Sequence, residues 1–188
     1  MAIVSLLAVC VGFARTYFLA GWFRAPLPNW LIHVHGAAFT LWIVLFVFQI
    51  GLVTARKPRC IAALARSASG LAVLMIVLGV LVASDRLARH VGEPDKTKPE
   101  DVLAFYAVPM GDMLMFATFG ALGYRRRCDP AAHKRLMLFA TFGLLDAAFD
   151  RWSVFDPYSL PVLDVICFAP LILLTAGYDW CRPVVFRR

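Results

Sequence analysis

The sequence predicts an all-α protein, an integral membrane helical bundle with about six transmembrane helices. The 188-residue chain is 61% hydrophobic and only 16% charged, whereas an ordinary soluble domain is about half apolar and roughly one-quarter charged. The apolar residues fall into windows of about 20 residues, the length that crosses the hydrocarbon of a bilayer. Basic residues stand in short runs between these windows, as they do in the loops of membrane proteins.

Basic residues and prolines delimit the first three spans. Residues 2–23 form the first span, which ends at Arg24 before a turn that contains two prolines. The second span covers residues 30–55 and ends at Arg56. The third covers residues 69–88, and an earlier start as an interfacial helix from Ile61 is an alternative.

The last three spans contain proline or ionisable residues. The fourth, residues 103–124, contains Pro109, which predicts a kink because proline removes a helical hydrogen bond. The fifth covers residues 134–155 and the sixth residues 160–181. Four or five spans are the alternative count, because Arg15 in the first span and two aspartates in the fifth are costly in lipid.

The whole chain, residues 1–188, is expected to form a single transmembrane domain. A net charge of +7 would suit nucleic acid in a soluble protein, but here the basic residues border apolar spans, so we expect no nucleic-acid partner. The five cysteines include no CxxC pair and indicate neither a disulfide framework nor a zinc site. The motifs HExxH, Walker A, GxGxxG and GxSxG are absent, so the sequence identifies no enzymatic reaction.

The distribution of lysine and arginine predicts the orientation, because cytoplasmic loops carry the excess of these residues. The richer side has twelve: Arg56, Lys57, Arg59, Arg66, Arg125, Arg126, Arg127, Lys134, Arg135, Arg182, Arg187 and Arg188. The other side has six: Arg24, Arg86, Arg89, Lys96, Lys98 and Arg151. We therefore expect a multi-pass protein of the bacterial cytoplasmic (inner) membrane, with both termini in the cytoplasm.

Ionisable residues inside the spans predict a buried polar cluster in the outer half of the bundle. At about 1.5 Å of rise per residue, Arg15, Asp112 and Asp146 share one depth, about 2–3 Å outside the midplane. An unpaired buried charge is hard to sustain, so we expect one or both aspartates to neutralise Arg15. A second layer lies farther out and contains His35, Asp150, Arg151 and Asp164, with Tyr17 between the layers.

Two interpretations of this cluster stay open. Its members are either structural pairs that fix the register of the helices, or they surround a site that opens to the outside. Such a site would hold a quinone, a haem, a metal or a small solute. Small residues at helix-packing spacing, by contrast, are expected to be packing contacts: Gly36 with Thr40, Gly79 with Ala83, and Gly120 with Gly123.

Three histidines, His33, His35 and His133, are candidate cofactor ligands. His33 and His35 are two residues apart and point about 200° away from each other on a helix, so at most one faces the bundle interior. His133 begins the fifth span on the cytoplasmic side, so it cannot share a ligand with His35. Two centres, one on each side as in dihaem cytochromes, would be needed, and no dedicated metal site is predicted.

Three segments carry a resemblance that covers most of the chain: GFARTYFLAGWF, LIHVHGAAFTLWIVLFVFQIGLV and AVPMGDMLMFATFGALGYRRRCDPAAHKRLMLFATFGLLDAAFDR. Through them the chain resembles a family of uncharacterised bacterial polytopic membrane proteins with an HxHG…HKRLM pattern. It is also distantly similar to predicted membrane proteins of unknown function with a Q…HRxxG pattern. The matched positions are His33, His35, Gly36, Trp42, Gln49, Asp112, His133, Lys134, Arg135 and Arg151.

At one position this chain departs from the pattern of the family that it resembles. Such relatives carry a histidine where Arg66 stands in this chain. If that histidine pairs with the one in HKRLM around a haem or a metal, this protein has lost the cytoplasmic centre.

The leading hypothesis is a polytopic cytoplasmic-membrane protein of undefined activity, in contact with the lipid bilayer and acting as an accessory subunit beside other membrane subunits. The first alternative is a redox protein that binds b-type haem or quinone in the outer half of the bundle. The second is a small-solute or proton-coupled transporter that uses Arg15, Asp112 and Asp146. No inverted repeat is evident, which disfavours the transporter.

Overall fold

The described part of the chain is all-helical. The computed structural model describes residues 2–19, 21–22, 29–56, 58–91, 99–149, 151, 169 and 173, and within them there is no strand. The elements in chain order are α1 (Ala2–Phe13), the π-helical turn η1 (Ala14–Phe18), α2 (Trp30–Thr54), α3 (Pro58–Val91), α4 (Pro99–Arg125), α5 (Pro130–Gly143) and α6 (Asp146–Phe149). The predicted all-α class is therefore confirmed.

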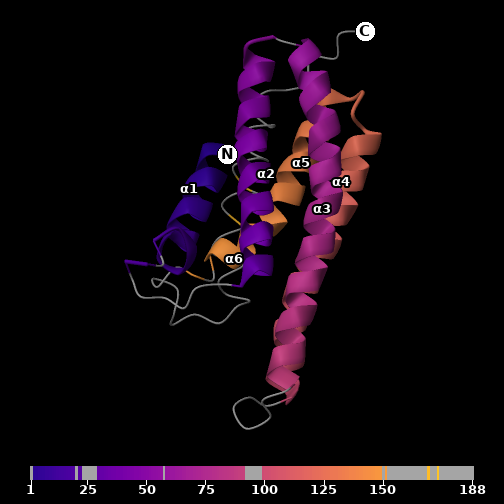
Figure 1. Ribbon diagram of the computed structural model, residues 1–188. Helices are drawn as coiled ribbons and strands as arrows, with labels where there is room; N and C mark the ends of the chain where they lie inside the picture. The colour runs from indigo at the N-terminus through magenta and orange to yellow at the C-terminus, as the bar shows by residue number, and fades with distance from the viewer. Residues whose placement is uncertain are drawn as a thin grey trace.

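The long helices form an up-and-down bundle (Figure 1). α2 packs against α3, α3 against α4, and α4 against α5, while α1 packs against α2 and α6. Since successive long helices run in opposite directions, the α2–α3 turn and the α4–α5 turn lie at the same end (Figure 1). The start of α2, the end of α3 and η1 lie toward the other end.

Two of the described helices are long and apolar enough to cross a membrane, judged by length and composition. They are the 24-residue stretch Trp30–Val53 of α2 and the 26-residue stretch Leu64–Arg89 of α3. A shorter apolar helix, Ile3–Phe13, belongs to α1. The second expected span, residues 30–55, matches α2 except for residue 55. The third, residues 69–88, lies inside α3, which begins at Pro58, before both the expected start and the alternative start at Ile61. The fourth lies inside α4, where Pro109 is accommodated within the helix.

The first and fifth expected spans differ from the helices observed. The α-helix of the first span ends at Phe13 and continues as η1 only to Phe18. The fifth span is interrupted: α5 ends at Gly143, and the N–H groups of Leu144 and Leu145 bond back only three residues, to Thr141 and Phe142. Glycine is unfavourable within a helix, which fits the end of α5 at Gly143. Met115 fills the space beside this glycine, since a Cβ on Gly143 would lie 2.9 Å from the Cε of Met115. The sixth expected span, residues 160–181, lies outside the described residues except for residues 169 and 173.

Local capping chemistry explains several helix ends. The Asn29 side chain accepts a hydrogen bond from the N–H of Ile32 and so begins α2. Asp129 caps α5 in the same way, through the N–H groups of Ala131 and Ala132, with Pro130 in the first turn. α2 ends where Arg56 takes the left-handed conformation, with φ of 53°.

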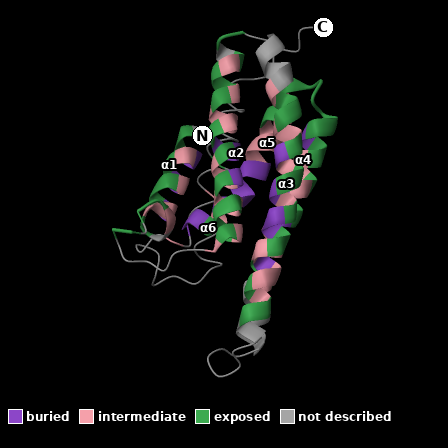
Figure 2. Ribbon diagram, in the orientation of Figure 1, coloured by how far each residue is buried: buried purple, intermediate pink, exposed green. Residues whose placement is uncertain are grey.

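The main core joins α2, α3, α4 and α5 around Trp42. The indole N–H of Trp42 donates to the hydroxyl of Thr141 at 3.3 Å, and its ring meets Phe116 edge-on at 5.0 Å between centroids. Both ring partners are almost fully buried, and Met75 of α3 completes the contact surface. A second, smaller cluster joins α1 to α5 and α6 through Ala8, Phe142, Leu145 and Phe149. Figure 2 shows the buried residues on the facing sides of the helices and exposed residues on the outer sides.

The Trp42–Thr141 hydrogen bond yields a first prediction. Thr141→Val keeps the shape of the side chain but removes the acceptor of a buried N–H. We expect a loss of about 1 kcal/mol in unfolding free energy. That value lies above the ~0.6 kcal/mol average of interhelical bonds in membrane proteins and at the low end of the ~1–3 kcal/mol for an unsatisfied buried donor. Unfolding in detergent measures it.

The matched control is Thr141→Ser, which keeps the hydroxyl and loses only a methyl group. It should be clearly more stable than Thr141→Val. Equal losses in the two variants would show that the hydrogen bond contributes nothing.

Candidate functional site

Polar side chains gather at the end of the bundle where α2 begins, which we call the polar end; its members include Tyr17, Asn29, His33, Asp85 and Arg89. The Tyr17 hydroxyl donates to the His33 carbonyl oxygen at 3.3 Å and lies 3.2 Å from its Nδ1. The Tyr17 ring also packs over Gly36, where an added Cβ would lie 3.2 Å from the ring. Tyr17 therefore fixes η1 against the first two turns of α2.

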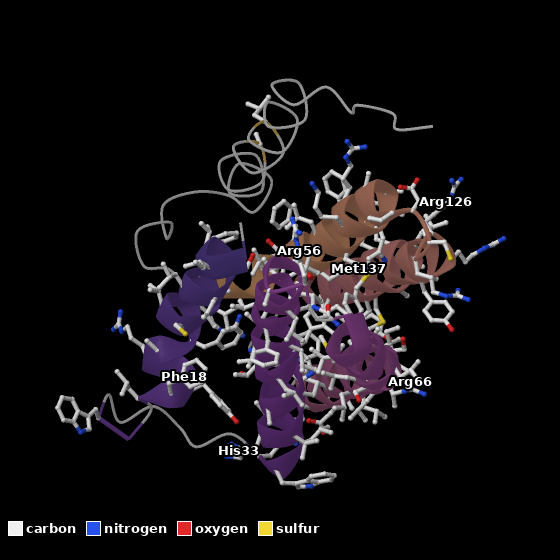
Figure 3. All side chains as sticks on the ribbon, turned by 90° about the horizontal axis from the view of Figure 1, so that it is seen from above. Phe18, His33, Arg56, Arg66, Arg126 and Met137 are labelled. Carbon is white, nitrogen blue, oxygen red and sulfur yellow. The ribbon has the colours of Figure 1, made fainter. Side chains whose placement is uncertain are left out.

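The π-helical turn explains how Tyr17 reaches α2. A π-turn inserts one extra residue, so the residues after it rotate relative to the face of the preceding α-helix. Such turns recur at functional sites. Figure 3 shows Phe18 of η1 and His33 of α2 at the rim of the bundle.

An ion pair at the polar end is a feature that the sequence analysis missed. Asp85 accepts from Arg89 at 3.0 Å, and the amide of Asn29 donates to the same carboxylate at 3.4 Å. Asn29 thus caps α2 and also links it to the end of α3. The spacing of four residues between Asp85 and Arg89 was a usable signal, since such pairs face each other on a helix.

His35 lies two residues after His33 in α2 and is half-buried. Its ring stacks against Phe39 with 4.1 Å between centroids. Its Nδ1 is buried and has no hydrogen-bond partner among the described residues. The expected grouping of His35 with Arg151 in one outer polar layer stays a prediction.

Arg151 is held in place by α1 and α6. Its guanidinium lies 4.7 Å from the centre of the Phe13 ring, at cation–π distance, and it donates a short hydrogen bond to the carbonyl oxygen of Ala147. α1 can approach α6 because residue 12 is glycine: a Cβ there would lie 2.9 Å from the carbonyl carbon of Ala148. The sequence signal for this contact was the stripe of small residues Ser5, Ala8 and Gly12, all of them buried.

One expected member of the buried cluster is not buried. Arg15 lies in η1 with an exposed side chain. The prediction assumed a continuous α-helix, and the π-turn changes which residues face the bundle. η1 also packs beside α1, whereas α4, which carries Asp112, packs against α3 and α5. The expected burial of Arg15 is therefore wrong, whereas its pairing with Asp112 or Asp146 stays a prediction.

The remaining members of the predicted cluster are distributed over several elements. Asp112 in α4 and Asp146 at the start of α6 are both half-buried. Asp150 and Asp164 lie outside the described residues. The helix break before Asp146 also means that Asp146 does not continue the face of α5.

The third candidate histidine, His133, lies at the opposite end of the bundle. Its Nδ1 is 2.8 Å from the carbonyl oxygen of Gly123, and since a carbonyl can only accept, Nδ1 carries the proton. This bond ties the first turn of α5 to the last turns of α4. Its position confirms that His133 and His35 cannot serve one ligand.

No metal centre is evident within residues that the structure describes, because no three His, Cys, Asp or Glu side chains are grouped there. Comparisons with family models, with curated proteins and with solved structures gave no match to this chain. The resemblance drawn from the HxHG and HKRLM segments therefore stays a prediction.

The contact between Gly12 and Ala148 yields the second prediction. In Gly12→Ala the new methyl group meets backbone atoms, which cannot move cheaply, so we expect a loss of about 1–3 kcal/mol in unfolding free energy. The control is Gly70→Ala in α3, where a Cβ meets nothing within 4 Å. There the change should stabilise the helix by about 0.5–1 kcal/mol. Thermal unfolding in detergent compares the two, and equal effects would contradict the close approach of α1 and α6.

Proposed function

We propose that this chain is a multi-pass integral protein of the bacterial cytoplasmic membrane, with about six spans and an accessory role beside other membrane subunits. The observation that carries the proposal is the exposure of the two long apolar helices. Only 17% of the apolar window in α2 and 28% of that in α3 is buried inside the protein. A core helix of a soluble protein would bury most of such a window, whereas lipid solvates it directly.

The exposed apolar side chains follow the outer faces of these helices. Those in α2 include Val34, Leu41, Val44, Phe48 and Val53, and those in α3 include Val73, Leu74, Val77, Val80 and Leu81. Apolar patches on soluble monomers rarely exceed a few hundred Å², so a face of this length needs lipid or partner subunits.

The charges at the two ends of the bundle support the proposed orientation. Arg56 and the run Arg125–Arg127 lie at the end formed by the α2–α3 and α4–α5 turns (Figures 1 and 3). At the polar end, Arg89 is paired with Asp85. Cytoplasmic loops carry the excess of lysine and arginine, so the run of three arginines favours placing the α4–α5 turn in the cytoplasm.

Cysteine labelling tests membrane insertion and orientation together. Cys128 is exposed in the α4–α5 turn, and Arg89, with 63% of its side chain exposed, marks the polar end. A variant that keeps only Cys128 should react with a membrane-impermeant maleimide only after the cells are permeabilised. Arg89→Cys in a cysteine-free background should react in intact spheroplasts.

Two outcomes would overturn the proposal. Recovery of the protein in the soluble fraction without detergent would contradict its proposed location in the membrane. Equal labelling of both positions in intact spheroplasts would contradict the proposed orientation of the helices in the membrane.

A second proposal is that the outer half of the bundle binds b-type haem or a quinone through His35. The buried Nδ1 of His35 supports it, because a buried polar atom without a partner is costly and calls for an explanation. A neutral imidazole can ligate haem iron or donate to a quinone carbonyl.

The test compares His35→Phe with His33→Phe, since His33 is the exposed histidine of the same helix. Protein purified in mild detergent should show a Soret band for haem, or yield quinone on solvent extraction. We expect His35→Phe to lose the bound cofactor by tenfold or more, in keeping with the loss of a ligand or its support. His33→Phe should keep it, and an absence of both cofactors in the unmodified protein would reject this second function.

A further inference from the structure

The turn between α4 and α5 presents three consecutive arginines to the surroundings. Arg125, Arg126 and Arg127 are all exposed, at the point where the apolar α4 ends. Figure 3 shows the Arg126 side chain directed away from the helices. Lys134, in the first turns of α5, is also exposed.

The acidic residue in the same turn, Asp129, forms no ion pair with the three arginines. The carboxylate of Asp129 is used in capping α5, where its Oδ1 accepts from the N–H groups of Ala131 and Ala132 at 3.1 and 3.2 Å. Among residues that the structure describes, no acidic side chain pairs with Arg125 or Arg126. Their positive charge is therefore available to a ligand.

An aromatic residue orders one side of the cluster. The guanidinium of Arg127 lies 4.6 Å from the centre of the Tyr124 ring and donates to the Tyr124 carbonyl oxygen at 3.2 Å. Tyr124 is itself exposed, at the boundary between the apolar helix and the charged turn. Tyrosine is enriched at the level of lipid headgroups, so the two neighbouring arginines lie at that level as well.

We propose that Arg125 and Arg126, with Arg127 held on Tyr124, bind the phosphate of an anionic phospholipid headgroup. This inference rests on the proposed membrane function and adds the ligand of its cytoplasmic face. Arginine suits the role because its planar fork of donors matches phosphate oxygens. Each basic residue near an anionic membrane surface raises the binding constant by about fivefold.

The test titrates phosphatidylglycerol, and in parallel zwitterionic phosphatidylcholine, into the full chain in a neutral detergent and follows the apparent melting temperature. Phosphatidylglycerol should raise it by about 5–10 °C at saturation, the shift expected for a ligand at about a hundred times its dissociation constant in a chain of this length. Phosphatidylcholine should give no comparable shift. In Arg125→Gln/Arg126→Gln the phosphatidylglycerol midpoint should move to about 30-fold higher lipid.

The matched control is Arg86→Gln/Arg89→Gln, which removes the same charge from the other end of the bundle and should leave the midpoint within about twofold. Equal shifts with the two lipids, or equal weakening in both double variants, would overturn the site. An equal shift in melting temperature with inorganic phosphate at the same concentration would show that the site binds phosphate without requiring a lipid. A chain that stays soluble without detergent would instead contradict the membrane function, so the two failures are distinguishable.

Discussion

Trp42 connects helices that are far apart in the chain: its indole N–H bonds to Thr141, 99 residues away, while its ring meets Phe116 of α4. In the proposed membrane setting, burial of apolar surface does not by itself hold helices together, so association would depend on close packing and on interhelical hydrogen bonds. Trp42 supplies both in one side chain. Because α2, α4 and α5 meet there, the relative height of these helices is fixed, and with it the position of the turns at each end.

Close approach between helices is achieved by pairing glycine with methionine or with backbone. A Cβ on Gly79 would overlap Met113, and one on Gly123 would lie 2.8 Å from the sulfur of Met137. Small residues in such positions let neighbouring backbones or flexible side chains fill the space. The predicted packing role of Gly79 and Gly123 is therefore confirmed. Gly120, for which the same role was predicted, meets nothing within 4 Å.

The two ends of the bundle differ in the interactions that their polar and charged side chains make. At the polar end, Asp85 pairs with Arg89 and Asn29, and Tyr17 bonds to His33. At the other end, Asp129 is committed to the α5 amides, which leaves Arg125 and Arg126 free for an external anion. The exposed arginines of the α4–α5 turn fit the proposed contact with an anionic membrane surface.

The sequence by itself determined the helical class and the approximate bounds of α2, because long apolar runs between basic turns admit few other structures. It located α3 but not its length, since α3 begins at Pro58, eleven residues before the expected start. It also placed His133 and His35 at opposite ends. Only the tertiary structure decided the break after Gly143, the π-turn that exposes Arg15, and the partners of Trp42, Asp85 and Gly12. Depth along a helix follows from counting residues, but the face that a side chain occupies depends on the exact helical twist and on the neighbours across the bundle.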